Sequence, residues 1–404
     1  MQALAEAYVR LVLAVGQHDA AYVDAYYGPA EWRVEAEARK APLSDLAVEA
    51  ARLREALDAS PVPASPDGQA RRRFLRGQVV AVDARIAQLL GTRFTFDQES
   101  ALFYDAVAPT HAEAYFQATV VELEALLPGS GPLIERLDAF RAQFIIPPSR
   151  LAPVFEAAID QCRRQTAEWV ALPDDESFTV EYVSDKPWSG YNWYQGGYRS
   201  VIQVNTDLPV YIDRAVDLAA HEGYPGHHLY NLLIEQRLVR ERGWTEFTVY
   251  PLFSPQSLIA EGTANFGIEV AFPGETRVRF DRDVLMPLAG LPVAEADRYD
   301  QVMRLAARLA YAGNEAARQY LDGSIDRAAA AAWLTRYALM SPARADHRTR
   351  FIDVYRSYVI NYNLGQDLVR QYVEAQGGTA DTPSRRWQVF LDLLQSPRLP
   401  SGLR

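Results

Sequence analysis

Three of the chain's six histidines lie within eight positions, in the run His221-Glu-Gly-Tyr-Pro-Gly-His-His228. Imidazole nitrogens and carboxylate oxygens are common zinc ligands, and a helix that reads His-Glu-x-x-His presents two imidazoles on one face with a glutamate as general base. Here the next histidine follows His221 after six positions, at His227. Six residues turn about 600° in an unbroken helix, so these two rings would lie on different faces.

Pro225 and Gly226 interrupt this run and change the expectation. Proline removes an intrahelical hydrogen bond, and glycine tolerates unusual backbone dihedral angles. A two-residue bulge would return His227 to the place of the second ligand, and we favour this residue. His228 is the alternative, although about 10 Å of helical rise would separate its Cα atom from that of His221. Without a metal, the same run would be a helix end with surface histidines.

A third ligand must come from elsewhere in the chain, because a catalytic zinc ion takes three protein ligands and leaves one position open. The stretch from Ser254 to Glu269 predicts a helix that opens at Ser254-Pro255. Glu261 lies in its middle among small and apolar residues, where a carboxylate is costly unless it is paired or bound to metal. Glu261 is therefore the first candidate, and Glu269, two turns further, could share its face.

The His221–His228 run and the later Glu261-Gly-Thr-Ala segment resemble the bacterial family known as domain of unknown function 885. That family is similar to the Glu-zincin metallopeptidases. The resemblance extends to Val204-Asn-Thr206 and to Tyr362-Asn-Leu-Gly-Gln366, and it covers about residues 180–370.

This resemblance implies a mostly helical peptidase fold with an active-site cleft and one zinc ion on His221, His227 and Glu261. Many members of the family carry tryptophan after the Glu-Gly pair, where this chain has Thr263. Since that position shapes the pocket, the difference bears on the substrate.

Zinc chemistry then assigns roles to the remaining candidates. Zinc lowers the pKa of a bound water towards about 7, and Glu222, next to His221, would accept its proton as general base. A donor to the oxyanion is also required, for which Tyr362 is the first choice. The reserves for that role are Tyr358 and His347.

The expected substrate contacts come from the segment before the histidine run. The strand expected over residues 200–205, which ends at Asn205, could bind an extended peptide by strand addition. Tyr191 could line a pocket, although clustered aromatic residues more often simply pack together.

Helical periodicity dominates the elements that must position these residues. It predicts helices over residues 44–59 (with Ser44 as N-cap), 70–90, 110–127 and 132–144, from Pro209 through Arg240, and from about Glu295 to the end. Alternation predicts strands over residues 178–183 and 200–205, with a loop over residues 188–198 and another over residues 60–68. The expected fold is mainly α, a zincin-like helical peptidase fold with a small central β-sheet beside the active-site helix.

The pair Pro147-Pro148 is the expected boundary between two regions. Residues 1–146 would form an N-terminal helical region and residues 147–404 a zincin-like catalytic region, packed as one large unit around a cleft.

Composition excludes several classes of function. With 41 basic and 52 acidic residues the chain has a net charge of −11, which argues against a nucleic-acid partner. The single cysteine, Cys162, excludes an intramolecular disulfide and a cysteine-rich metal site. No apolar stretch is long enough to span a membrane, and no signal peptide is recognisable, so we expect a cytoplasmic protein without a membrane partner.

Together these features predict a zinc-dependent metallohydrolase, most simply a peptidase that cleaves peptide bonds in a peptide or peptide-like small substrate. One alternative is a zinc amidohydrolase that acts on a non-peptide amide. Another is a non-catalytic helical binding protein with a peptidase-like fold. The presence of Glu222 argues against this last alternative, because a protein without catalysis has no need of a general base.

Overall fold

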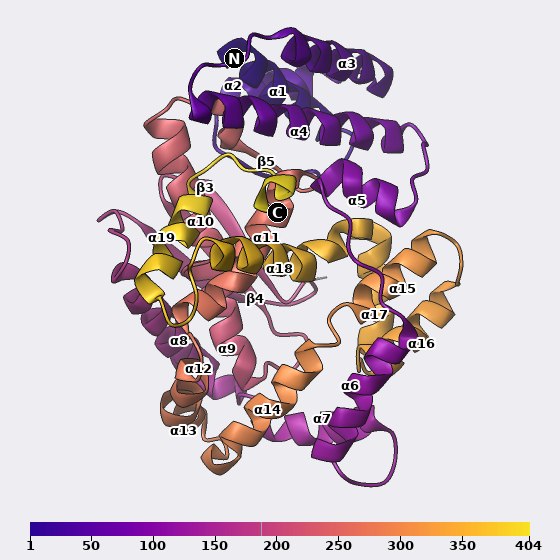
Figure 1. Ribbon diagram of the computed structural model, residues 1–404, viewed down its shortest axis with the longest axis vertical. Coiled ribbons are helices and arrows are strands. Elements are labelled where there is room, and N and C mark those ends of the chain that lie inside the picture. The colour runs from indigo at the N-terminus through magenta and orange to yellow at the C-terminus, as the bar shows by residue number, and fades with distance from the viewer. Residues whose placement is uncertain (187) are drawn as a thin grey trace.

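Helices dominate the computed structural model, which describes residues 1–186 and 188–404 (Figure 1). Its first part contains α1 (Gln2–Val15), β1 (Val23–Tyr26), α2 (Ala30–Arg39), α3 (Leu43–Ala59), α4 (Pro66–Leu89), α5 (Phe96–Tyr104), α6 (Glu113–Leu126), α7 (Leu133–Arg141) and α8 (Leu151–Ala167). The middle contains β2 (Ser177–Val183), β3 (Gly190–Gly196), β4 (Arg199–Asn205), α9 (Ile212–Leu218), α10 (His227–Ile234), β5 (Val249–Pro251) and α11 (Pro255–Ala271). The last part contains α12 (Thr276–Phe280), α13 (Met286–Ala289), α14 (Ala296–Ala307), α15 (Ala312–Leu321), α16 (Arg327–Tyr337), α17 (Pro342–Tyr355), α18 (Ile360–Ala375) and α19 (Pro383–Leu394).

The mainly helical prediction is confirmed, and α3, α4, α6 and α7 match four of the expected helices with ends shifted by a few residues. Ser44 is not an N-cap, because α3 already begins at Leu43 after Pro42. The expected loop over residues 60–68 ends early, since Ser65 accepts a hydrogen bond from the Gly68 N–H and Pro66 opens α4. Proline suits the first helical position because its fixed φ is helical and its missing N–H would be unpaired there.

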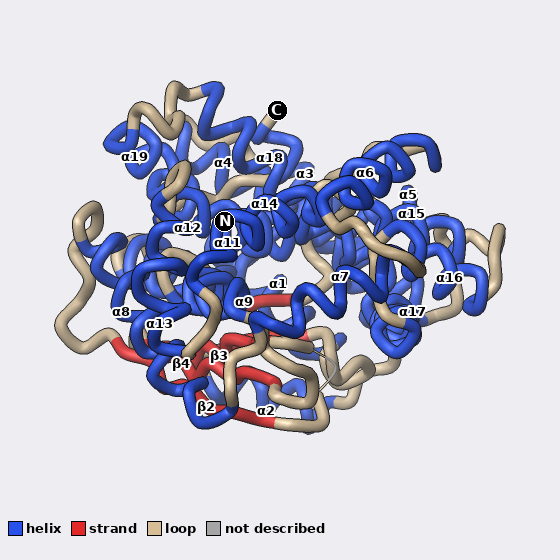
Figure 2. Tube along the Cα trace, turned by 90° about the horizontal axis from the view of Figure 1, so that it is seen from below, coloured by secondary structure: helices blue, strands red, loops and turns tan. Residues whose placement is uncertain are grey.

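The central sheet has the order β2-β4-β3, with β2 parallel and β3 antiparallel to β4. Figure 2 shows these strands gathered along one side of the molecule. Alternate residues of β4 point inward, and Ile202 and Val204 meet Phe155 and Ile159 of α8 there. Leu218, the last residue of α9, lines the same space, so the sheet lies beside the helix that leads to the histidine run.

Two expectations about this sheet are wrong. The segment over residues 188–198 is not a loop, because residues 190–196 form β3. Its glycines and polar residues hide an alternation in which Asn192 and Tyr194 are buried and Trp193 is exposed. Residues 200–205 also cannot accept a peptide by strand addition, because β4 is hydrogen-bonded to a strand on both sides.

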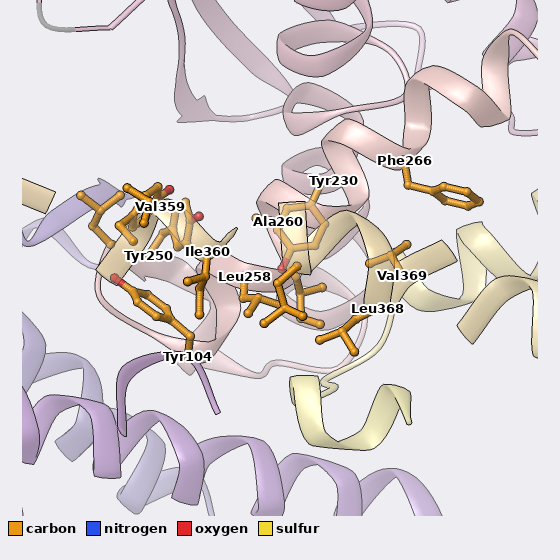
Figure 3. Close-up of a cluster of buried hydrophobic side chains, with 14 of the residues drawn as sticks. Tyr104, Tyr230, Tyr250, Leu258, Ala260, Phe266, Val359, Ile360, Leu368 and Val369 are labelled. Atoms are coloured by element: carbon orange, nitrogen blue, oxygen red, sulfur yellow. The ribbon is translucent and has the colours of Figure 1, made fainter. Parts of the chain in front are cut away.

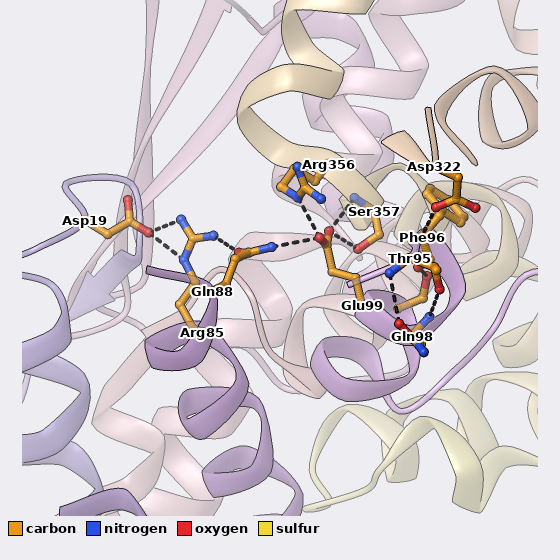
Figure 4. Close-up of polar contacts among 11 residues, drawn as sticks. Asp19, Arg85, Gln88, Thr95, Phe96, Gln98, Glu99, Asp322, Arg356 and Ser357 are labelled. Atoms are coloured by element: carbon orange, nitrogen blue, oxygen red, sulfur yellow. Dashed lines mark hydrogen bonds and ion pairs between the residues drawn. The ribbon is translucent and has the colours of Figure 1, made fainter. Parts of the chain in front are cut away.

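The N-terminal elements pack directly onto the later ones. In Figure 1, α1–α4 form a layer across the top of the molecule, and β1 pairs with β5 below them. Figure 4 shows Glu99 of α5 accepting hydrogen bonds from Arg356 and from the backbone and side chain of Ser357. These bonds fix the short turn between α17 and α18, at the point from which Tyr358 reaches the candidate site.

Helix α11 runs through the centre of the core and is crossed by α18. Leu258 and Ala260 of α11 lie among Ile360, Leu368 and Val369 of α18 (Figure 3). At the crossing, glycine faces glycine: a Cβ atom at Gly262 would lie 2.5 Å from the carbonyl carbon of Gly365. The two backbones can approach so closely only because neither residue has a side chain.

In the part of the chain that the structure describes, no helix combines the length and the apolar character needed to cross a membrane.

We expect Gly262→Ala to destabilise the protein by about 1–3 kcal/mol or more, because the added methyl group meets backbone that cannot move aside. Gly313→Ala in α15 is the matched control, since a Cβ atom there meets no atom within 4 Å and the change should be neutral or slightly stabilising. Denaturant unfolding of both variants measures the difference. Equal stability of the two variants would contradict the proposed packing of α11 against α18.

Candidate metal site

The histidine run folds as two short helical segments joined by a sharp turn. Helix α9 continues into a π-helical turn, Ala219–Gly223, which carries His221, and α10 then begins at His227. Between them, a Cβ atom at Gly226 would lie 1.9 Å from the carbonyl oxygen of His221, so only glycine fits. The interruption brings the Nε2 atoms of His221 and His227 to 3.1 Å from each other.

Glu261 of α11 completes a group of three possible metal ligands. Its Oε2 atom lies 3.2 Å from His221 Nε2 and 3.8 Å from His227 Nε2. The ligand atoms of the three residues all lie within 4.8 Å of one another, and each side chain keeps a small exposed fraction. Three helical segments, the π-helical turn after α9, α10 and α11, thus bring the three candidate ligands to one point.

The donor set fits a zinc ion. Zinc bonds of 2.0–2.2 Å in a tetrahedral arrangement separate the ligand atoms by about 3.3–3.6 Å, close to the distances found here. Glu261 Oε2 is buried and has no hydrogen-bond partner among residues 1–186 and 188–404. The carboxylate therefore has a free ligand atom that faces two imidazole nitrogens.

The pKa values of His221 and Glu261 show which of the two residues carries a proton in the metal-free protein. Burial alone would lower the pKa of His221, but contact with Glu261 and the charges of Glu222 and Glu261 outweigh burial and raise this pKa to about 9. Burial would raise the pKa of Glu261, yet the two imidazoles hold it well below its usual range. A proton on His221 therefore occupies the site and must leave when a metal binds.

Asn265, which was not identified from the sequence, orients the imidazole ring of His221. Its Oδ1 atom lies 3.0 Å from His221 Nδ1, and its Nδ2 atom donates to the carbonyl oxygen of Tyr362 at 2.9 Å. A partner on Nδ1 fixes the ring and leaves Nε2 free for a metal. Asn265 follows Glu261 by four residues, a spacing that shares one helix face and was the available signal.

Glu222 lies against the edge strand of the sheet. The residue is buried, and its Oε1 atom would be 2.9 Å from a Cβ atom at Gly190 of β3. Its carbonyl oxygen accepts a hydrogen bond of 2.7 Å from Asn192 of the same strand. Thus β3, rather than β4, is the strand next to the candidate general base.

The two candidate tyrosines have different surroundings. The Tyr358 hydroxyl donates to Glu261 Oε1 at 2.8 Å and so supports the ligand. The Tyr362 ring lies 5.7 Å from that of Tyr358, and its hydroxyl makes no hydrogen bond within the described residues. Burial, together with the charge of Glu261, raises the pKa of Tyr362 well above its usual value, so this hydroxyl stays protonated and can donate.

Four other candidates lie outside the three-residue group. His347 is exposed on α17, and Glu269 pairs with Arg370 and accepts a hydrogen bond from Gln366. Asn205 donates to the carbonyl oxygens of Lys186 and Trp188, and Tyr191 stacks on Trp188. Thr263, which stands where the family often has tryptophan, donates to carbonyl groups of its own helix and is buried.

His228 belongs to a separate buried network below the sheet. Its Nδ1 atom lies 2.8 Å from the Ser200 hydroxyl, and its Nε2 atom lies 3.0 Å from Glu176 Oε2. Tyr224 and Arg163 also donate to this carboxylate. Burial alone would raise the pKa of Glu176, but these three donors outweigh it and lower the pKa to about 2. Both ring nitrogens of His228 therefore make hydrogen bonds within the core.

Asp24 is a further carboxyl group that sequence reasoning missed. It lies in β1 where the pairing with β5 shifts register between Val23 and Ala25. Burial, reinforced by the charges of Glu261 and Glu222, raises the pKa of Asp24 to about 8. Its neighbours in the sequence carry no motif, so only the fold brings this carboxyl group near the site.

Comparison with known proteins shows a similar fold and no more. No family model matches the chain, and no curated protein matches it. Among solved structures, the chain is similar to "the putative lipoprotein from Colwellia psychrerythraea", with a TM-score of 0.56 and 15% identity over 89% of this chain. This chain spans only 65% of that protein. A "putative lipoprotein of unknown function from Shewanella oneidensis" matches with a TM-score of 0.45 and 12% identity, over 91% of this chain and 79% of that one.

We expect zinc affinity to rise with pH. Because His221 has a pKa of about 9 in the metal-free protein, zinc must displace a proton at any lower pH. The apparent affinity should increase by about tenfold per pH unit between pH 7 and pH 9 and level off above that range. Competition with a chelator of known affinity measures it, and a constant affinity from pH 7 to pH 9 would contradict the assigned proton.

The two adjacent histidines should respond differently to substitution by alanine. His227→Ala should lose most bound zinc with little loss of stability, because the ring lies at the partly exposed site. His228→Ala should keep one zinc ion but lose about 2–4 kcal/mol, since it leaves a cavity and removes a buried charged hydrogen bond. Elemental analysis and denaturant unfolding measure the two effects. Loss of zinc from a fully stable His228→Ala protein would reverse the assignment.

Proposed function

We propose that this chain is a zinc-dependent hydrolase that cleaves peptide bonds, with one ion held by His221, His227 and Glu261. The observation that carries the proposal is the convergence of these three ligand atoms next to Glu222, among them a buried carboxylate oxygen that accepts no hydrogen bond within the described residues. The motif resemblance to domain of unknown function 885 and to the Glu-zincins supports the same activity.

When bound, zinc would polarise the scissile carbonyl group and lower the pKa of a water molecule. The Glu222 carboxylate accepts a proton from the attacking water and returns it to the leaving amine. Tyr362 donates a hydrogen bond to the developing oxyanion, while Tyr358 and Asn265 hold Glu261 and His221 in place. Strand β3 offers an extended substrate the sheet edge nearest to Glu222.

Replacement of Glu222 by glutamine tests the general base. The change keeps the shape of the side chain but removes the proton acceptor, so peptide hydrolysis should fall by about 10²–10⁴-fold while zinc content stays the same. Glu241→Gln is the control, because this glutamate lies on the surface and pairs only with Arg237. A zinc-loaded Glu222→Gln protein with the parent's turnover would refute the mechanism.

The cytoplasmic location expected from the sequence stays a prediction. The similar structure from Colwellia psychrerythraea is described as a putative lipoprotein; the description applies to that protein and makes a membrane-associated location the alternative. Fractionation of the native cell with an antibody against this chain distinguishes the two locations.

A further inference from the structure

Three half-buried arginines, Arg141, Arg344 and Arg348, have no carboxylate within 4.0 Å in the described part of the chain. Arginines elsewhere in that part pair with a carboxylate, donate a hydrogen bond from the side chain or are exposed. The Nε atoms of Arg141 and Arg348 are fully buried and have no hydrogen-bond partner there. Burial of an unpaired charge is costly, so these side chains are not explained by the stability of the fold.

Two of the guanidinium groups, those of Arg141 and Arg344, lie against one aromatic ring, and Arg348 lies on the same helix as Arg344. Arg141 ends α7, and its guanidinium carbon lies 4.1 Å from the centre of the Tyr211 ring, directly before α9. Arg344 lies 5.4 Å from the same ring. Arg348 follows Arg344 by one helical turn of α17, so both side chains share a face of that helix.

Arg348 connects this cluster to the candidate metal site. Its guanidinium carbon lies 4.6 Å from the ring centre of Phe351 and 6.0 Å from that of Tyr362. Tyr362 in turn packs against Tyr358, which is hydrogen-bonded to Glu261. Arg348 therefore lies beside the tyrosine assigned to the oxyanion, so a substrate group that Arg348 binds would lie near the scissile bond.

We infer that Arg348, with Arg344 one turn away on the same face of α17, binds a carboxylate of the substrate near the scissile bond. This inference rests on the proposed function and specifies its substrate class. A planar guanidinium group binds a carboxylate through two parallel hydrogen bonds, and the aromatic rings of Phe351 and Tyr362 hold that plane in position. The carboxylate is either the C-terminus of a short peptide or an acidic side chain.

Hydrolysis of matched peptides separates these two sources. Short peptides are offered as the free C-terminal acid and as the C-terminal amide, each with glutamate or glutamine in the last position. If Arg348 binds the C-terminus, amidation should lower kcat/KM by about 10–150-fold, the value of one charge-assisted hydrogen-bonded contact. If it binds a side chain, the change from glutamate to glutamine should have that effect. Equal hydrolysis of all four peptides overturns the inference.

Substitution of the arginine tests the assignment. Arg348→Gln should reduce kcat/KM for the preferred carboxylate peptide to the level of its uncharged counterpart, chiefly through KM, and Arg348→Lys should recover part of the loss. Because it removes an unpaired buried charge, Arg348→Gln should not lower the melting temperature. Arg350→Gln is the control, since Arg350 lies two residues further on α17, exposed and paired with Asp346. Unchanged selectivity in Arg348→Gln overturns the inference.

A binding measurement keeps this inference separate from the proposed activity. Calorimetry with the chelator-treated protein compares three ligands. Acetyl-Ala-Ala has a free C-terminal carboxylate, the C-terminal amide of acetyl-Ala-Glu has only a side-chain carboxylate, and the C-terminal amide of acetyl-Ala-Ala is the uncharged reference. A carboxylate ligand should bind to the parent chain and to Arg350→Gln but not to Arg348→Gln. Such binding without any peptide hydrolysis by the zinc-loaded protein would refute the proposed activity and leave the carboxylate site. Equal binding of all three ligands overturns the carboxylate site itself.

Discussion

A carboxylate buried in the middle of a core helix is the constraint on which the site depends. Glu261 is almost fully buried in α11, where an ionised group is stable only if other groups compensate its lost hydration. Two imidazoles and one phenol supply this compensation. These contacts impose two conditions on the backbone. The start of α18, just after Tyr358, must lie close enough to α11 for the Tyr358 hydroxyl to reach Glu261, and α10 must turn back towards His221.

Glycine satisfies both conditions. Gly262 and Gly365 allow α11 and α18 to meet backbone to backbone, and Gly226 allows the chain to pass against the carbonyl group of His221. The Glu-Gly pair and the Tyr-x-x-Gly-Gln segment thereby acquire a physical meaning, since each combines a polar side chain with the glycine that lets it reach the site. In both segments the glycine is required for packing and the polar side chain for the chemistry of the site.

Sequence reasoning recovered the features that local patterns determine. The long amphipathic helices follow from periodicity. The structure also brings together His221, His227 and Glu261, the ligand set that the family resemblance implies, while metal binding by these residues stays a prediction. Strand β3 was missed because its alternating buried and exposed positions hold glycine, asparagine and aromatic residues rather than branched apolar residues. Asp24 was missed because its charged neighbours, Glu222 and Glu261, lie about two hundred residues away in the sequence. Arg348 was missed because its burial and its lack of a carboxylate partner arise from tertiary packing, which no local pattern encodes.

Charges of opposite sign lie on two sides of the candidate site. Glu222 and Glu261 place negative charge on one side. Burial, reinforced by these two charges, raises the pKa of Asp24 to about 8, so this carboxyl group is protonated at neutral pH. Beyond Tyr362, Arg141, Arg344 and Arg348 carry positive charge and have no carboxylate within 4.0 Å in the described part of the chain. Under the proposed function, the first side would repel a substrate carboxylate and the second would attract it, so a bound peptide would have one preferred orientation. Because zinc would offset part of the negative charge, its loss would strengthen the repulsion and weaken binding near Glu222 without changing that orientation.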